Sequence, residues 1–467
     1  MNFNNKHTLI FAIHRTVSWW HFLGKNLGCA SSTVLTDLRG EGDISVVDDF
    51  YNELKRMRKR PDPAFTLLTE TQVADVIARC RVLRWLEPDL ARAMIEAMAF
   101  SLDRVLDRLN PDVVLSLPID RYPTDVLDRL AQARGIPYVQ LTASIFPGMS
   151  MLLQRGKLLL SDFEPPSDLL REKLNELTAP SFVPSYVPKK STYTTAKFVR
   201  TLGYFQLRAL AFKAISYIKR DPLNLHYLDA QPNLGHKCRW RDIRVVRFAS
   251  TDWQDKLRSF PQDKRVLFGL QLFPEASIDY WIDSVELIDH ESLIVDAVTA
   301  FSRAGFLVLV KDHPLQFGFR QAELLERLLA LPNVVIVPYD VPGNKLLEMV
   351  DINFTCTGTL GMQAALMGKT SVVTDSYYTN EKDFILFRNR EEVHGLPARV
   401  MADRQQMVNL EKRHERIVCQ VLQGSFDGDL FSFKNFDPSK PAQAALQLGQ
   451  ALGKRLAELI ASPNDAS

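Results

Sequence analysis

The chain of 467 residues has few cysteines, and they form no metal-binding or redox motif. The five are scattered and never make a C-x-x-C pair: Cys29, Cys80, Cys238, Cys356 and Cys419. Zinc sites need clustered ligands, and scattered thiols in odd number are typical of a reducing compartment. We therefore expect a cytoplasmic protein without a zinc site.

Long apolar runs and a strong net charge are also missing. The apolar runs are strand-sized, well short of the ~20 residues that span a bilayer, and Leu9–Ile13 is too short for a signal peptide. The formal net charge is +2, which argues against nucleic acid as a partner. With 46% hydrophobic and 24% charged residues, the composition is that of a soluble globular protein, and the length favours two domains.

Familiar phosphate and metal motifs are absent as well. There is no G-x-G-x-x-G sequence and no G-K-[ST] loop. No D-x-D sequence stands at a strand end that the pattern predicts, and Asp48-Asp49 is interpreted as helix capping. We therefore predict no bound metal.

What the sequence does contain is two stretches in which short β-like runs alternate with longer helical patterns. The first has predicted strands at Thr8–Ile13, Thr33–Thr36, Ala64–Leu68, Pro111–Pro118 and Ile136–Leu141, with helices at Val17–Leu27, Asp49–Lys59, Thr71–Leu86, Asp89–Leu109 and Tyr122–Arg134. The second has predicted strands at Arg265–Leu270, Phe306–Val310, Asn333–Val337, Ile352–Thr355 and, as the last strand, Thr370–Thr374, with helices at Val285–Arg303, Arg320–Leu331, Asn344–Val350 and Leu360–Met367. This alternation predicts an α/β fold with two doubly wound parallel sheets.

The predicted domains are 1–155, a partly helical basic insertion at 156–262, a second α/β domain at 263–400, and helices at 401–467 that pack back on the first domain. Between Lys189 and Arg247 the insertion has thirteen Lys or Arg against three Asp. A predicted helix at Ala196–Lys219 places Lys197, Arg200, Arg208 and Lys219 near one face. Two interpretations stay open: a solvated face at a domain junction, or a helix lying on the anionic inner face of the inner membrane.

An imidazole follows the strand in FLVLVKDHPLQ, Phe306–Gln316. Ligands of parallel α/β sheets bind beyond the carboxyl ends of the strands, where His313 is expected. Pro314 disfavours helix at His313, and Lys311 adds positive charge. His313 is therefore a candidate donor to a phosphate oxygen, against the alternative of a loop histidine bonded to the backbone nearby.

A second candidate anion site is the turn in TCTGTLGMQAA, Thr355–Ala365. Thr357, Gly358, Thr359 and Gly361 join a predicted strand to a predicted helix. Glycines allow close approach of a ligand, and helix-terminal N–H groups favour anions. The alternative is an N-cap and a glycine needed for helix–strand packing. Two such sites at neighbouring strand ends suggest a nucleotide phosphate between them.

Polar residues also follow the first strand of the second domain, in LQLFPEAS, Leu270–Ser277. Gln271 and Glu275 are expected at the same sheet edge, where a carboxylate can bind hydroxyl groups or act as an acid or base. An ordinary loop is the alternative interpretation for both.

In the first domain the predicted strand Pro111–Pro118 leads to Asp120 and Arg121. Asp120 is a candidate catalytic carboxylate or acceptor contact, with helix N-capping as the alternative, and Arg121 suits an anionic acceptor. His14 follows another predicted strand and is a weaker candidate. The aromatic cluster Trp19, Trp20, His21 and Phe22 is interpreted as core in preference to a sugar platform.

The ordered set LQLFPEAS, LVKDHP and TGTLGMQAALMGKTSVV resembles the bacterial capsule and surface-polysaccharide biosynthesis proteins, which include Kdo-transferring enzymes of capsule assembly. It lies mainly in 264–380. The resemblance implies a GT-B glycosyltransferase, with two Rossmann-like domains facing across a cleft. It also implies a nucleotide-sugar donor, such as a CMP-sugar, as substrate without a separate cofactor, and a glycan or lipid-linked acceptor.

The resemblance further implies that His313 contacts the donor phosphate and that Thr357, Gly358 and Thr359 form the phosphate-binding turn. Such a site would stabilise the leaving group without a metal. The chain departs from the family pattern TGTxGxEA because Gln363 replaces the glutamate that would accept ribose hydroxyls. Two alternatives therefore stay open: a nucleotide-sugar epimerase of the same shape, and a glycan-binding assembly component without turnover.

Overall fold

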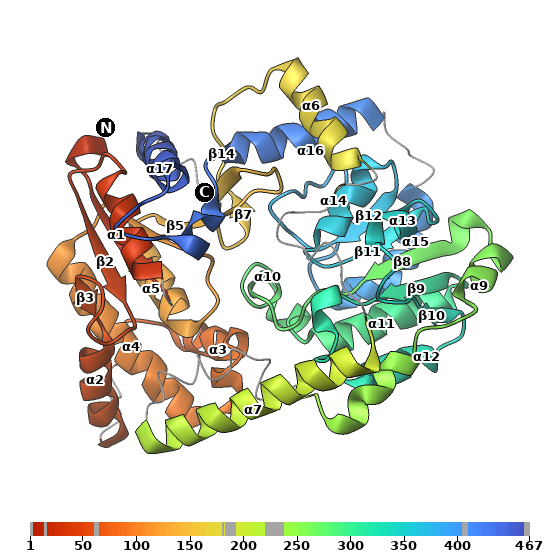
Figure 1. Ribbon diagram of the computed structural model, residues 1–467, viewed down its shortest axis with the longest axis horizontal. Coiled ribbons are helices and arrows are strands. Elements are labelled where there is room, and N and C mark those ends of the chain that lie inside the picture. The colour runs from red at the N-terminus through yellow and green to blue at the C-terminus, as the bar shows by residue number, and fades with distance from the viewer. Residues whose placement is uncertain are drawn as a thin grey trace. The chain divides into compact units, whose positions relative to one another are not determined.

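The computed structural model describes residues 3–13, 16–59, 65–179, 182, 193–219, 238–403 and 410–461. Within these ranges, no helix combines the length and the apolar character that crossing a bilayer requires. The chain divides into two compact units (Figure 1). Unit 1 comprises Met1–Glu164 and Gln420–Ser467, and unit 2 comprises Pro165–Cys419.

Unit 1 is built on a mostly parallel sheet, whose described strands follow the order β14-β6-β5-β4-β1-β2-β3, with β7 paired to β6. Strands β1 to β5 run parallel, whereas β6 is antiparallel to β5 and β14 is antiparallel to β6. The strands are β1 (His7–Ala12), β2 (Ser31–Thr36), β3 (Ile44–Ser45), β4 (Val113–Ser116), β5 (Tyr138–Ala143), β6 (Met149–Gln154), β7 (Lys157–Leu158) and β14 (Ser425–Asp427).

Helices flank this sheet, and the C-terminal helix belongs to the same unit. The helices are α1 (Val17–Lys25), α2 (Val47–Lys59), α3 (Glu70–Arg79), α4 (Pro88–Leu109), α5 (Tyr122–Ala133) and α17 (Gln443–Ala461). Trp19 and Trp20 of α1 share a buried cluster with Leu448 and Leu452 of α17. A Cβ at Gly453 would lie 1.9 Å from the Leu27 carbonyl oxygen, so α17 approaches the end of α1 more closely than a larger residue allows.

Unit 2 has a parallel sheet, with the described strands in the order β10-β9-β8-β11-β12-β13. Its strands are β8 (Arg265–Gly269), β9 (Leu307–Lys311), β10 (Val334–Ile336), β11 (Ile352–Phe354), β12 (Thr370–Val373) and β13 (Ile385–Leu386). This is the doubly wound order in which the chain direction across the sheet reverses between the first and fourth strands, here β8 and β11. Ligands of such sheets bind outside the carboxyl ends of the strands at that switch point.

The helices of unit 2 cover both faces of its sheet and a long helix, α7, precedes it (Figure 1). They are α6 (Ser167–Thr178), α7 (Thr195–Lys219), α9 (Trp253–Ser259), α10 (Ala276–Asp279), α11 (His290–Arg303), α12 (Ala322–Leu329), α13 (Gly343–Leu347), α14 (Thr359–Leu366) and α15 (Leu396–Asp403), with α16 (Leu410–Gly424) leading into unit 1. Gly305, at φ +80°, ends α11 and releases the chain into β9. The strands are buried on both faces, as parallel strands covered by helices must be.

The α/β class with two largely parallel sheets is confirmed, but several predicted elements were wrong. The described part of the strand predicted at Ala64–Leu68 is loop, while Ala64 lies outside the described residues. The helix predicted at Thr71–Leu86 ends at Arg79, and a short 3-10 turn follows at Leu83–Trp85. Its start is sharp because Thr69 and Gln72 form a capping box.

One predicted helix is interrupted in the structure, and some strands were not predicted. The predicted helix Val285–Arg303 is a 3-10 turn at Val285–Leu287 followed by α11, which Asp289 caps by accepting from the Ser292 N–H. Thr370–Thr374 is not the last strand, because β13 and β14 follow it. The β6–β7 hairpin was missed as well, since its turn at Arg155-Gly156 carries no Asn-Gly or Asp-Gly signal.

Candidate functional site

Gln271 and Thr357 meet at the switch point of the unit 2 sheet. Gln271 follows β8 and Thr357 follows β11, the two strands between which the order reverses. The Gln271 side chain donates from Nε2 to Thr357 Oγ1 at 2.8 Å and accepts from the Thr357 N–H at Oε1 at 2.7 Å. Both residues are buried, so this pair fixes the start of the turn that leads into α14.

The glycines of the turn permit close packing on both sides. A Cβ at Gly358 would lie 2.8 Å from Thr355 Oγ1, and one at Gly361 would lie 2.6 Å from the Tyr378 hydroxyl. Tyr378 is fully buried and donates from its hydroxyl to the Gly358 carbonyl at 2.7 Å. The packing alternative raised for these glycines thus has direct support, and a bulkier residue would force the turn to shift.

The N-terminus of α14 presents backbone donors beside this turn. Gly358 is the N-cap, with no side-chain cap, and Gly361 N–H donates to the Gly358 carbonyl at 3.0 Å. The amides of α14 before Gly361 have no intrahelical acceptor, and the helix dipole favours negative charge there. Gly358 and Thr359 are partly exposed, whereas Gln363, one turn further on, is 8% exposed.

His313 caps the 3-10 turn Pro314–Gln316 that follows β9. Its side-chain Nδ1 accepts from the Leu315 N–H at 3.2 Å, and its backbone N–H donates to Asp312 Oδ1 at 2.8 Å. Burial lowers the pKa of His313 to about 4, and the charges of Arg320 and Lys311 act in the same direction. The imidazole is therefore neutral near pH 7, with Nδ1 as acceptor and the proton on Nε2, a donor suited to an anion.

A buried ion pair connects the loop of His313 to the turn that begins at Thr357. Arg320 donates to the Asp312 carboxylate, with Nη2 to Oδ1 at 2.8 Å, and both side chains are 1% exposed. The same Nη2 donates to the Gln271 carbonyl at 3.2 Å. Hydrogen bonds thus run from His313 through Asp312 and Arg320 to Gln271 and on to Thr357, along the carboxyl ends of three adjacent strands.

Lys311 ends β9 and is almost fully buried. Its Nζ donates to the Tyr339 carbonyl at 2.9 Å, and the Tyr339 hydroxyl donates to Asp312. Burial lowers the pKa of Lys311 to about 8, although Asp312 and Asp340 oppose this shift. Lys311 carries its charge near pH 7, at a site where losing that charge is easier than for an exposed lysine.

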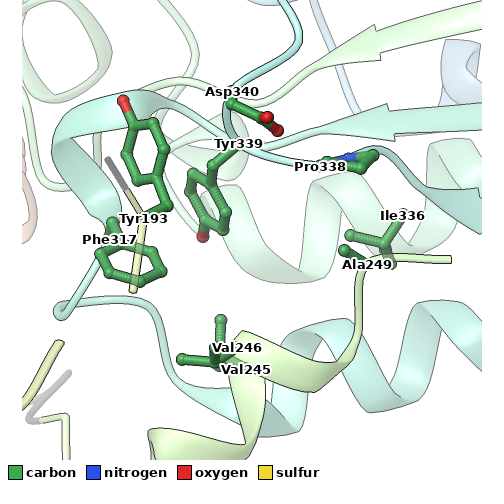
Figure 2. Close-up of a pocket in the computed structure, with 9 residues that line it drawn as sticks. All are labelled: Tyr193, Val245, Val246, Ala249, Phe317, Ile336, Pro338, Tyr339 and Asp340. Carbon is green, nitrogen blue, oxygen red and sulfur yellow. The ribbon is translucent and has the colours of Figure 1, made fainter. Parts of the chain in front are cut away.

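A pocket of about 290 Å³ lies at the end of β10 (Figure 2). One of its lining residues is Tyr339, whose carbonyl accepts from Lys311. Aromatic rings of Tyr193, Phe317 and Tyr339 line one part of it, and Val245 and Val246 line another. Asp340 is the one carboxylate among its lining residues and is exposed. Aromatic rings with a single carboxylate suit a planar ring that bears a hydrogen-bond donor.

Glu275 stands at the start of the short helix α10, in the loop that follows β8. It is the N-cap residue of α10, partly exposed, and its carbonyl accepts from Ile278 and Asp279 N–H groups. Gln316 connects this loop to the one after β9, by donating to the Phe273 carbonyl at 3.1 Å and accepting from the Phe273 N–H at 3.2 Å. The loops after β8 and β9 are therefore held together.

In unit 1, Asp120 and Arg121 follow β4. Arg121 is 2% exposed and donates from Nε to Asp120 Oδ1 at 3.0 Å and from Nη1 to Asp37 Oδ2 at 3.0 Å. The capping alternative for Asp120 was wrong, because Arg121 occupies the N-cap position of α5. Asp37 follows β2, so Arg121 bridges two strand ends and leaves the Asp120 carboxylate one-third exposed.

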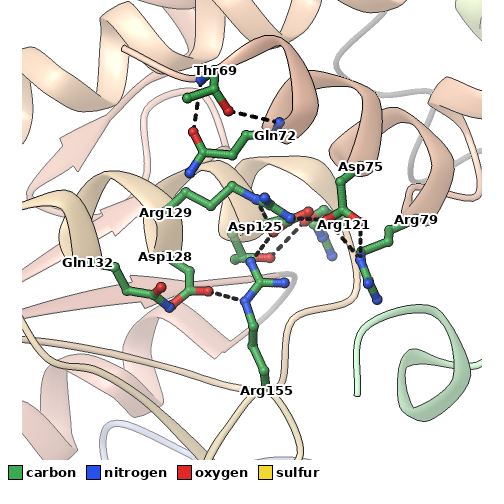
Figure 3. Close-up of polar contacts among 11 residues, drawn as sticks. Thr69, Gln72, Asp75, Arg79, Arg121, Asp125, Asp128, Arg129, Gln132 and Arg155 are labelled. Carbon is green, nitrogen blue, oxygen red and sulfur yellow. Dashed lines mark hydrogen bonds and ion pairs between the residues drawn. The ribbon is translucent and has the colours of Figure 1, made fainter. Parts of the chain in front are cut away.

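Further buried charges continue along α5 (Figure 3). Arg155, in the β6–β7 turn, donates to Asp125 and to Asp128, with 2.5 Å between its Nε and Asp128 Oδ2. Arg129 donates to Asp125 at 3.0 Å and also reaches Asp75 of α3. The arginines hold the pKa of Asp125 below its usual value despite burial. This network ties α3, α5 and the hairpin together, and we assign it a structural role.

The remaining sequence candidates fall elsewhere. His14 lies outside the described residues. Trp19 and Trp20 are buried, which confirms the core interpretation for these two, whereas His21 and Phe22 are half-buried. Sequence reasoning missed Arg320, Tyr339 and Tyr378, none of which stands in a motif; Arg320 was placed only as the first residue of a predicted helix. Within the described ranges, no group of three or more His, Cys, Asp or Glu could hold a metal ion.

Comparisons with known proteins give a family match and distant structural likenesses. Residues 184–379 match the family described as "Capsule polysaccharide biosynthesis protein". No curated protein matches the chain. The match begins at residue 184, earlier than the motif region at 264, and therefore includes α7.

Solved structures with some likeness include three sugar-active proteins. The beta Kdo 2,7 transferase KpsC of Thermosulfurimonas dismutans has 12% identity and a TM-score of 0.33, covering 75% of this chain and 88% of that one. The UDP-GlcNAc 2-epimerase of Neisseria meningitidis has 11% identity, a TM-score of 0.27 and coverages of 97% and 98%. That of Methanocaldococcus jannaschii has 12% identity, a TM-score of 0.27 and coverages of 88% and 98%. At such low similarity these likenesses say nothing about the activity of this chain.

The resemblance that the motifs indicated is thus confirmed by an independent match over a region that contains Gln271, His313 and the Thr357–Gly361 turn. Residues 184–379, less than half of the chain, therefore match the capsule polysaccharide biosynthesis protein family.

Proposed function

We propose that the protein is a glycosyltransferase that takes a sugar from a nucleotide-sugar donor bound by unit 2. The observation that carries the proposal is the hydrogen-bond chain from His313 to Thr357, which lies at the switch point of a doubly wound sheet. Neutral His313 and the first amides of α14 offer donors to a phosphate, and Lys311 supplies positive charge. The match of residues 184–379 to a capsule polysaccharide family supports a sugar as the transferred group.

In this mechanism the bond between the anomeric carbon and the donor phosphate oxygen breaks, and the nucleotide leaves. His313 Nε2–H and the α14 amides stabilise the charge that develops on the phosphate, and preorganised donors of this kind contribute strongly to catalysis. An acceptor hydroxyl forms the new bond to the anomeric carbon, and its proton passes to a carboxylate. We assign that carboxylate to Asp120, because it follows β4 beside the switch point of unit 1 and is held by Arg121.

We assign the donor's base to the pocket beside Lys311. Tyr193, Phe317 and Tyr339 provide apolar faces, and Asp340 accepts a hydrogen bond from an exocyclic amino group. Cytosine has such a group and uracil does not, and Asp accepts from the cytosine amino group in other recognition sites. The proposed donor is therefore a CMP-sugar such as CMP-Kdo, with a glycan or lipid-linked acceptor.

The test follows nucleotide release from CMP-sugars and UDP-sugars, with and without acceptor glycan. The proposal expects release from a CMP-sugar only when acceptor is present, together with a product enlarged by one sugar. Isomerised donor without acceptor would instead make the protein an epimerase. Glycan binding without any nucleotide release or nucleotide binding would make it an assembly component, and Gln363 is the residue to examine in that case.

A matched pair of variants tests the base assignment. Asp340→Asn keeps the side-chain shape but adds an amide donor, so we expect weaker CMP binding and a smaller preference over UMP. Asp263→Asn, an exposed carboxylate before β8, is the control and should bind CMP as the unmodified protein does. If the unmodified protein bound CMP and UMP with equal affinity, the assignment of the base to this pocket would be wrong. That result would not bear on the proposed phosphate site.

A further inference from the structure

The second half of α7 carries an apolar surface that nothing in the described structure covers. Its large exposed side chains are Leu207 at 70%, Leu210 at 64%, Tyr217 at 84% and Ile218 at 77%. Large apolar side chains on a protein surface usually occur singly, so four within twelve residues of one helix call for a partner.

These residues share one side of the helix. At 100° per residue, positions 207, 210, 211, 214, 217 and 218 fall within an arc of about 120°, and all six are apolar: Leu207, Leu210, Ala211, Ala214, Tyr217 and Ile218. The first half of α7 is anchored differently. Phe198 and Leu202 are buried in the unit 2 core, and Phe205 packs on Phe319 at a centroid distance of 4.1 Å. Figure 1 shows that α7 extends away from the sheet of unit 2.

An exposed indole continues this apolar surface. Gly203 falls on the same side of α7, and a Cβ built there would lie 3.9 Å from Cη2 of Trp240. Trp240 is 52% exposed. Tryptophan and tyrosine are enriched where protein meets the boundary between lipid headgroups and acyl chains, so Trp240 and Tyr217 suit that boundary.

The charge of α7 selects the partner. Thr195–Lys219 contains five cations and no acidic residue: Lys197, Arg200, Arg208, Lys213 and Lys219. A second copy of this chain would bring an identical cationic helix against it, and like charges repel. An anionic lipid surface instead attracts each cation, and long Lys and Arg side chains reach headgroups while their stems lie along apolar neighbours.

We propose that the second half of α7, with Trp240, docks on an anionic lipid bilayer, its apolar arc entering the headgroup boundary and its cations binding lipid phosphates. At 1.5 Å per residue α7 is about 37 Å long and lies along the surface, since no described helix has the apolar character to span a membrane. The proposal is independent of the transferase chemistry, because it concerns residues away from the donor site and its test uses no donor.

The test sediments the full-length protein with vesicles of phosphatidylglycerol and phosphatidylcholine, and with vesicles of phosphatidylcholine alone. We expect about tenfold or stronger binding to the anionic vesicles, weakened by added salt. The triple variant Leu207→Gln, Leu210→Gln and Ile218→Gln should lose about tenfold or more of this binding. Glutamine has a helix propensity near that of leucine, so α7 should stay helical by circular dichroism.

The matched control is Leu160→Gln with Phe163→Gln, which removes exposed apolar side chains, 49% and 47% exposed, outside α7. It should sediment like the unmodified protein. Equal binding to both vesicle types, or an unchanged triple variant, overturns the proposal. It is also overturned if light scattering gives a dimer that the triple variant abolishes while neither form sediments, because a second copy then covers the arc.

Discussion

Gln271 and Thr357 hold each other by two hydrogen bonds across the point where the unit 2 sheet reverses its strand order. Each bond uses a different end of the Gln271 amide, so Thr357 fixes the orientation of the whole side chain. Gln271 therefore positions the turn, and contact with a bound donor falls to the groups that the turn presents.

Gln271→Leu should loosen this turn. The substitution keeps the side-chain bulk but leaves the buried Thr357 N–H without its acceptor, a loss of about 1–3 kcal/mol. We expect a lower melting temperature and weaker binding of CMP, measured by scanning and titration calorimetry. Gln262→Leu, at an exposed position where the amide bonds Asp351, is the control and should alter neither. If Gln271→Leu were destabilised but bound CMP with unchanged affinity, the turn would have no role in donor binding.

His313→Asn separates the two roles of the imidazole. The asparagine oxygen can accept from the Leu315 N–H in place of Nδ1, but nothing replaces the Nε2–H donor. We expect near-normal thermal stability with a fall in kcat of about 100-fold, the scale of losing one transition-state donor.

Two companions make the His313 experiment decisive. His313→Ala removes both the cap and the donor, so it should lose stability as well as activity. His394→Asn, at an exposed histidine, should leave both unchanged. Full activity in a folded His313→Asn would contradict the assignment of His313 to the donor phosphate.

Binding of the anionic donor should depend on pH through Lys311. Its pKa is lowered to about 8 by burial, so the ammonium is charged below that pH and neutral above it. We expect CMP affinity to be greatest near neutrality and to fall roughly fivefold or more as the pH rises through 8, as expected for losing one nearby charge. In Lys311→Met the affinity should be low and flat over the same range. A profile of the unmodified protein that is flat through pH 8 would rule out this role.

The buried pair of Asp312 and Arg320 should be essential for folding stability. Asp312→Asn leaves the Arg320 charge buried without its counter-ion, which typically costs about 3–5 kcal/mol. Chemical denaturation should show this as a lower midpoint. The double variant Asp312→Asn with Arg320→Met removes the stranded charge and should recover part of the loss. A double variant less stable than the sum of both single variants would contradict this account.

Asp120→Asn should affect the transfer step and spare donor binding. It keeps the hydrogen bond from Arg121 through the amide oxygen but cannot take a proton, and losing a general base typically costs about 100-fold or more in kcat. CMP affinity, measured by calorimetry, should be unchanged because Asp120 belongs to unit 1. Asp48→Asn, an exposed carboxylate that also pairs with an arginine, is the control. Normal turnover by Asp120→Asn would show that another group acts as the base.

Much of the fold follows from local sequence patterns. Buried runs such as Val113–Ser116 and Leu307–Lys311 are apolar because a parallel sheet is covered on both faces, and they were predicted within one or two residues. The helices α4, α5 and α7 were placed equally well. Patterns failed at β7, β13 and β14, because strands of two or three residues carry no periodicity. They also failed at the antiparallel strand β6, whose turn into β7 has no Asn-Gly or Asp-Gly signal.

The candidate site was likewise predictable only in part. The sequence by itself determined that His313 and the Thr357–Gly361 turn follow strands, since a strand end is a local property and parallel strands end at one edge. Only the tertiary structure decided that Gln271 bonds Thr357, and that Arg320 connects Asp312 to the Gln271 carbonyl. Those contacts join residues 49 and 86 positions apart in the chain. Their burial and pairing depend on how strands β8, β9 and β11 are ordered, which no local pattern encodes.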